Sequence, residues 1–183
     1  MTQSEAEFNK LFDSIDTDRS GTIEFDEFVD ALNRVISTSP KDVSASVEVG
    51  LVQLTFQRLA NDDSGPNVFY ELLLADPSSK SILRDLKLER QSRMIFRMLG
   101  NAIQGLTRPE SAKAVLTKMG KRHLDFGVGP QNYSAVRVAM FGALEQVLGG
   151  EFKPYVRQAW EKQFRIVEDA LNQGVYEVAK SKL

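Results

Sequence analysis

Residues 116–149 read LTKMGKRHLDFGVGPQNYSAVRVAMFGALEQVLG. A helical segment ends near His123, a break with three glycine and proline positions follows at 127–130, and a long segment with an apolar face comes next. Glycine commonly ends a helix, and proline is tolerated in the first turn of the next one. The stretch therefore predicts two consecutive helices, with the only histidine of the chain near the end of the first.

Apolar residues at helical spacing continue on both sides of this stretch, and alternating strand patterns are absent. Further helices are predicted near 47–60, 66–75, 77–84, 87–104, 108–124, 130–148 and 151–173. Residues 1–36 read helix, loop, helix, and the small polar residues of 37–46, with one proline, predict a linker. We expect an all-α chain with one module over 1–36 and a second over 47–183.

Composition excludes several classes of site. The 183 residues contain no cysteine, which rules out disulfides, thiolate metal sites and cysteine nucleophiles, and one histidine, which rules out a multi-histidine metal site. No apolar run is long enough to span a membrane, and the polar N-terminus is unlike a signal peptide, so a cytoplasmic location is expected. The net charge of −2 argues against nucleic-acid binding. Residues 1–45 carry ten acidic and four basic side chains, a net charge of −6. Residues 46–183 carry fifteen acidic and nineteen basic side chains, a net charge of +4.

Residues 16–27, DTDRSGTIEFDE, resemble the loop of the EF-hand family, which binds calcium through hard oxygen ligands. Gly21 permits the sharp turn, Thr22 offers its carbonyl, Glu24 binds directly or through water, and Glu27 supplies both carboxylate oxygens. The predicted calcium ligands are Asp16, Asp18, Ser20, Thr22, Glu24 and Glu27. The alternative is an acidic surface turn.

Hands usually occur in pairs, and residues 60–71 are the one candidate for a second loop. Ala60 in the first ligand position and Asn67 in the eighth leave a decayed calcium loop open. An ordinary turn between helices is preferred, because the residues that follow fit another pattern better. The hand then pairs with a second molecule, as an EF-hand-mediated dimer, or with nothing.

The order Leu116, Gly120, His123, Gly127-Val128, Pro130, Tyr133 and later Ala159-Trp160 resembles the proximal half of globins, with flavohaemoglobins and neuroglobin-like chains nearest in pattern. FYELLLADPSSKSIL (69–83) resembles the globin segment before the distal helix. The resemblance covers about 47–176 and implies a globin fold with haem iron on His123. A metal-bound imidazole needs its other ring nitrogen held, and Tyr133 matches the position that approaches it.

The resemblance also implies a distal side. Tyr70 and Gln91 would donate hydrogen bonds to bound O₂, and Ile95 and Val128 would line the pocket. Leu83 stands where the family has a phenylalanine that packs on haem, so aromatic stacking is lost there. No second histidine exists to become a sixth ligand.

Three functions follow from these features. The first is reversible binding of O₂ or another diatomic gas at haem, regulated by calcium. The second is a redox activity such as NO dioxygenation, which needs a separate reductase because 183 residues leave no room for a reductase domain. The third, kept open by Leu83, is a haem-free, calcium-responsive interaction protein.

Overall fold

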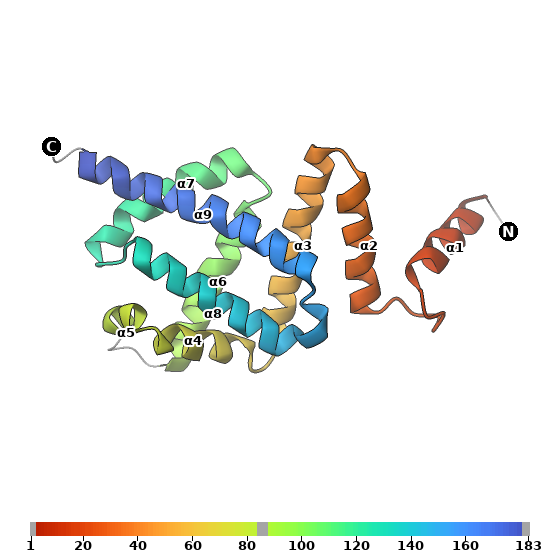
Figure 1. The fold of residues 1–183 in the computed structure, drawn as a ribbon, viewed down its shortest axis with the longest axis horizontal. Helices are drawn as coiled ribbons and strands as arrows, with labels where there is room; N and C mark the ends of the chain where they lie inside the picture. The colour runs from red at the N-terminus through yellow and green to blue at the C-terminus, as the bar shows by residue number, and fades with distance from the viewer. Residues whose placement is uncertain (1–2, 84–87, 181–183) are drawn as a thin grey trace. The chain divides into compact units, whose positions relative to one another are not determined.

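The computed structural model describes residues 3–83 and 88–180, and the side chains of these except at 3–5, 42 and 88–91. Every regular element in that part of the chain is a helix, which confirms the predicted all-α class (Figure 1). The α-helices are α1 (Gln3–Ile15), α2 (Phe25–Thr38), α3 (Lys41–Asn61), α4 (Gly65–Ala75), α5 (Pro77–Leu83), α6 (Leu88–Gly105), α7 (Pro109–Asp125), α8 (Pro130–Leu148) and α9 (Pro154–Lys180). None of the described helices has the length and apolar character that crossing a membrane requires.

The chain forms two compact units, Met1–Leu51 and Val52–Leu183, so the division falls inside α3. The first unit contains α1, α2 and the start of α3, and the second contains the remaining helices. The division lies a few residues inside the second predicted module, 47–183.

The predicted linker 37–46 is mostly helical. Only Ser39 and Pro40 separate α2 from α3. Ser39 is extended, as expected for a residue before proline, and the Ser44 hydroxyl donates to the Ile36 carbonyl at 2.7 Å. Small polar residues do not prevent a helix, so a two-residue break is enough to join α2 to α3.

Residues 62–64 form the turn between α3 and α4, which confirms the preferred interpretation of that segment. One carboxylate oxygen of Asp62 accepts the amide N–H groups of Ser64 and Gly65, both at 2.9 Å. The carboxylate therefore organises the start of α4.

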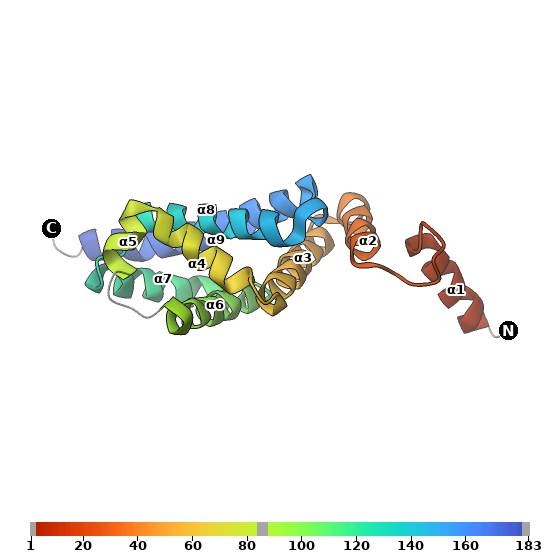
Figure 2. The ribbon, with the colours of Figure 1, turned by 90° about the horizontal axis from the view of Figure 1, so that it is seen from below.

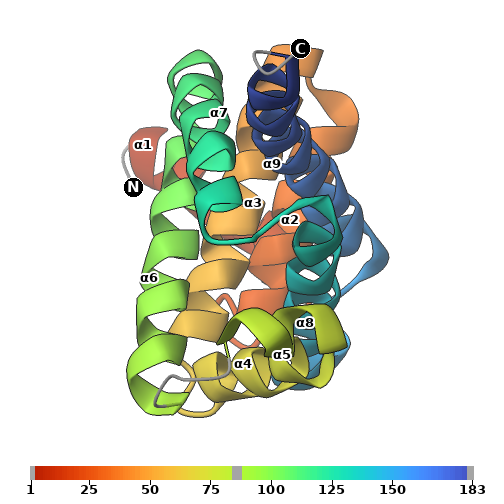
Figure 3. The same cartoon turned by 90° about the vertical axis from the view of Figure 1, so that its left-hand side faces the viewer.

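In the second unit, α6 and α7 lie on one side and α8 and α9 on the other, with α4 and α5 along one edge (Figures 2 and 3). Trp160 of α9 is buried, and its indole N–H donates to the Thr55 hydroxyl at 2.9 Å. The Phe56 and Phe96 rings stack with centroids 5.2 Å apart, and Phe69 meets Phe96 edge-on at the same distance. This aromatic packing connects α3, α4, α6 and α9.

Candidate functional site

The loop between α1 and α2 gathers three carboxylates. Oxygen atoms of Asp16, Asp18 and Glu27 all lie within 4.8 Å of one another. Two ligands about 2.3–2.6 Å from one calcium ion lie at most about 5 Å apart, so these three groups can share an ion. The structure therefore brings together half of the six predicted calcium ligands.

Backbone amides shape this loop around Asp16. Its carboxylate accepts the N–H groups of Ser20 at 3.0 Å and Gly21 at 2.9 Å. Gly21 has a φ of +84°, the left-handed region that favours glycine, and Arg19 has a φ of +58°. The hydroxyl of Ser20 donates to the Thr22 carbonyl at 3.0 Å, so these two predicted ligands contact each other.

Glu27 joins the beginning of the loop to α2. Its Oε1 accepts the Thr17 amide at 2.6 Å and the Thr17 hydroxyl at 2.9 Å, while Oε2 accepts the Glu24 amide at 3.1 Å. The Glu24 amide is the main cause that lowers the pKa of Glu27, and the Ser20 amide does the same for the pKa of Asp18. Both carboxyls are therefore ionised at neutral pH. The Glu24 side chain is exposed, and its place as a ligand stays a prediction.

The end of α7 presents His123 to Tyr133 of α8. The imidazole Nδ1 lies 3.3 Å from the Tyr133 hydroxyl, and the two rings are 5.8 Å apart at 40°. Desolvation by burial lowers the pKa of His123 and raises the pKa of Tyr133, so both side chains are neutral at pH 7. With Nδ1 occupied by the tyrosine, Nε2 is the ring nitrogen left to bind a metal.

A turn at Gly127 ends α7 shortly after this histidine. The His123 carbonyl accepts the Val128 amide at 2.9 Å, and the Leu124 carbonyl accepts the Gly127 amide at 3.0 Å. Gly127 has a φ of +72°. These bonds form a Schellman motif, which ends α7 and returns the chain toward the helix. Val128, predicted to line the pocket, thereby packs against the cluster around Tyr133.

This apolar cluster surrounds Tyr133 with side chains from three helices. Its buried members are Leu116, Tyr133, Ala170 and Leu171, and Met119 and Val128 pack against it. Leu116 and Met119 also line a groove of about 550 Å³ between α6 and α7, whose other apolar walls include Met98 and Val115. Cofactor and ligand sites commonly have volumes of about 300–1,000 Å³ and mostly apolar walls. His123 lies one helical turn beyond Met119 on α7 and is not among the residues that line this groove.

The predicted distal residues lie on three other helices. Tyr70 of α4 is buried, and burial raises its pKa. Leu83 ends α5, and Ile95 lies on α6; both are half-buried. Gln91 belongs to α6, but its side chain is outside the described residues. Their convergence on one ligand stays a prediction, whereas His123, Tyr133 and Val128 are brought together.

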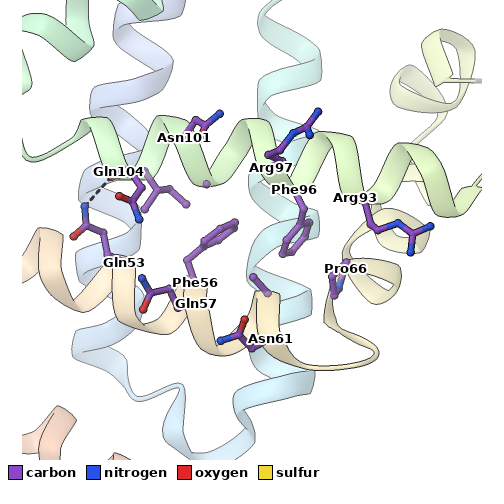
Figure 4. Close-up of a pocket in the computed structure, with 13 residues that line it drawn as sticks. Gln53, Phe56, Gln57, Asn61, Pro66, Arg93, Phe96, Arg97, Asn101 and Gln104 are labelled. Carbon is purple, nitrogen blue, oxygen red and sulfur yellow. Dashed lines mark hydrogen bonds between the residues drawn. The ribbon is translucent and has the colours of Figure 1, made fainter.

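A second concave region, between α3 and α6, was not indicated by any sequence motif (Figure 4). It encloses about 610 Å³ over the stacked rings of Phe56 and Phe96, with amide side chains along its edges. One of them, Gln53, donates to the Ile103 carbonyl at 3.2 Å. The two rings are visible in the sequence only as apolar positions of amphipathic helices, because their stacking depends on how α3 meets α6.

Comparison with known proteins agrees with both parts of this description. The globin family model matches residues 68–171, more than half of the chain, and the EF hand domain model matches residues 7–35. The chain belongs to the globin family. This globin thus carries an EF-hand segment before its globin domain.

Three relatives show how far the likeness extends. Hemoglobin subunit beta-2 of Xenopus laevis is 29% identical over 98 residues, 53% of this chain and 65% of that protein. The flavohemoprotein of Bacillus subtilis (strain 168) is 31% identical over 71 residues, 37% of this globin and 18% of the relative. The flavohemoprotein of Rhizobium meliloti (strain 1021) is 27% identical over 106 residues, 56% and 26% of the two chains. The globin therefore spans 65% of the hemoglobin subunit and 18% and 26% of the two flavohemoproteins.

Among solved structures, the ferric myoglobin of Aplysia limacina with azide has a TM-score of 0.56 to this globin. The match is 24% identical and covers 68% of this chain and 94% of the myoglobin. At that identity, the likeness shows the fold.

Proposed function

We propose that this globin binds haem through Nε2 of His123 and there takes up O₂ or another diatomic gas reversibly. The observation that carries the proposal is the 3.3 Å contact between His123 Nδ1 and the Tyr133 hydroxyl, which leaves Nε2 as the ring nitrogen for iron. Haem iron supplies the gas-binding chemistry when it is bound. Tyr133 fixes the ring orientation of His123.

On the distal side, we propose that the Tyr70 hydroxyl and the Gln91 amide donate hydrogen bonds to the bound gas. Burial keeps the Tyr70 hydroxyl protonated and therefore able to donate. Leu83 and Ile95 contribute apolar walls.

A haemin titration of the full-length chain tests this function. We expect an absorption band near 400 nm, as bound haem gives, that saturates at one haemin per chain and is lost in His123→Ala. A matched Tyr176→Phe variant, altered at an exposed ring of α9, should retain it. A chain that stays colourless would leave the haem-free interaction protein as the function.

A second candidate is NO dioxygenation with a separate reductase. The similarity to two flavohemoproteins, together with the buried Tyr70 hydroxyl, supports this candidate. Repeated loss of NO from the oxygenated protein, when a reductase and its electron donor are supplied, would support this activity. A single stoichiometric reaction would contradict it.

We further propose that the loop binds calcium through Asp16, Asp18, Ser20, the Thr22 carbonyl, Glu24 and Glu27. Calorimetric titration with Ca²⁺ should give one site per chain, weakened roughly tenfold or more by Glu27→Gln because ligand charge sets the affinity. Asp13→Asn, an equal change of charge on exposed α1, is the control. Equal affinities in all three proteins would contradict the assignment.

Regulation of gas binding by calcium is the remaining part of the proposal, motivated by the opposite charges of residues 1–45 and 46–183. Saturating calcium should change the O₂ dissociation rate in the full-length protein but not in Glu27→Gln. Identical rates with and without calcium would contradict regulation.

The exposed Ile23 of the loop, 37% accessible, supports pairing of the hand with a second copy of the chain. Sedimentation should then show a calcium-dependent dimer that Ile23→Lys abolishes. A calcium-loaded protein that stays monomeric would contradict this pairing.

A further inference from the structure

Helices α7 and α9 cross with their backbones in direct contact at two glycines, and they lie side by side in Figure 3. A Cβ atom added to Gly120 of α7 would lie 2.0 Å from the Leu171 carbonyl oxygen and 3.0 Å from the Leu171 Cα. A Cβ atom added to Gly174 of α9 would lie 2.0 Å from the Thr117 carbonyl oxygen. Each glycine faces backbone atoms, so no side-chain rotation makes room for a methyl group.

This crossing is one turn away from the histidine. Gly120 lies four residues after Leu116 and three before His123, so the three share one face of α7. The Leu171 residue that faces Gly120 also packs in the cluster with Leu116 and Tyr133. Tyr133 in turn holds Nδ1 of His123. Leu171 of α9 therefore limits how closely α7 approaches. It also supports Tyr133, which orients the His123 imidazole.

We infer that Gly120 and Gly174 are positioning residues, whose backbone contact keeps His123 in hydrogen-bond register with Tyr133. A methyl group at either position requires the helices to separate by on the order of 1 Å, since non-bonded atoms prefer about 3.5–4.0 Å. The His123–Tyr133 contact is already 3.3 Å long, so such a displacement breaks it. The consequence for haem rests on the proposed function, while the geometric claim does not.

The geometric claim is tested in the full-length, haem-free protein by NMR. His123 is the only histidine, so its ring protons are assigned without ambiguity. We expect a nuclear Overhauser effect between the His123 and Tyr133 rings in the unaltered chain, and its loss in Gly120→Ala and in Gly174→Ala. Gly142→Ala is the control, because the added Cβ meets only the end of the Leu72 side chain at 2.8 Å, which can rotate away.

The consequence for haem is measured with the same protein variants. Both positioning variants should release haem about tenfold faster or more, as is usual when the support of a metal ligand is removed, and their iron–histidine stretching band should shift. Gly142→Ala should match the unaltered chain in both measurements. An unaltered chain that takes up no haemin contradicts the proposed function but leaves the NMR result valid for the geometry.

Two results would overturn the inference. The first is an unchanged Overhauser effect between His123 and Tyr133 in folded Gly120→Ala and Gly174→Ala. The second is loss of cooperative folding in both variants, seen by circular dichroism, because the crossing would then support the whole fold rather than the histidine.

Discussion

The His123–Tyr133 pair is a polar contact with apolar surroundings. The protonation state of the His123 imidazole decides what this ring can bind. When Nε2 binds a metal, Nδ1 keeps its proton and donates it to the Tyr133 hydroxyl oxygen. Burial of both groups favours their neutral forms, so no proton has to leave His123 at pH 7 before a metal binds.

Removing the Tyr133 hydroxyl should weaken haem binding without unfolding the protein. In Tyr133→Phe the ring still fills the cluster, but Nδ1 loses its partner, and we expect about 10- to 100-fold lower haem affinity. Transfer of haem to an acceptor protein measures the change. Tyr176→Phe, at an exposed ring, should transfer haem at the unaltered rate, and equal rates in both variants would contradict the role of Tyr133.

The lowered pKa of His123 predicts how stability changes with pH. In the unfolded chain the imidazole takes up a proton near pH 6.5, whereas in the folded chain it does so at lower pH. The unfolded state therefore binds more protons between these values, and the free energy of unfolding decreases as pH falls through that window. Denaturant unfolding of the haem-free protein between pH 7 and 5 measures this decrease. It should be smaller in His123→Gln, and identical profiles would contradict the prediction.

At the scale of the helix, the end of α7 depends on one glycine. Gly127 has a φ of +72°, where a side chain costs about 1–2 kcal/mol. Gly127→Ala should therefore lower the free energy of unfolding of the globin unit by about that amount, as measured by denaturant unfolding. Gly150→Ala is the control, because a Cβ there meets no atom within 4 Å and φ is not in the left-handed region. Similar losses in both variants would argue against strain at Gly127.

Most helices followed from the sequence, and the two errors have a physical cause. Helix α8 was expected over 130–148 and is found there, because Pro130 and Gly149 mark its ends. Helix α9 was expected to end near residue 173 but continues to Lys180. Gly174 lies inside the longer helix, where the absence of a side chain lets its backbone approach the Thr117 carbonyl oxygen. Residues 37–46 suggested a linker, although their polarity is compatible with helices.

At the scale of the whole molecule, two compact units should unfold separately. Under the proposed function, calcium binds to the folded hand and haem to the folded globin unit. Each ligand should then stabilise its own transition, by about 2.7 kcal/mol at a hundredfold excess over its dissociation constant. Scanning calorimetry should show calcium raising the melting temperature of one transition and haemin that of the other. A single transition that responds equally to both ligands would contradict this independence.

The candidate sites differ in how much the sequence revealed. The calcium loop is local, so its ligands were predicted from a resemblance to the EF-hand family confined to twelve residues. The His123–Tyr133 pair was implied by resemblance to globins. The α6–α7 groove and the glycine crossing depend on distances between helices remote in sequence, which no local pattern contains.

The hydrogen bonds of Glu27 have a consequence for the rates at which the EF-hand loop binds and releases a cation. Its carboxylate already accepts the amides of Thr17 and Glu24, so the loop is preorganised before a cation arrives. Little ordering entropy is left to lose, but those amide bonds must loosen as the carboxylate turns to the cation. Cation binding in such a loop replaces amide hydrogen bonds by bonds to the cation, which favours fast association and fast dissociation over very high affinity.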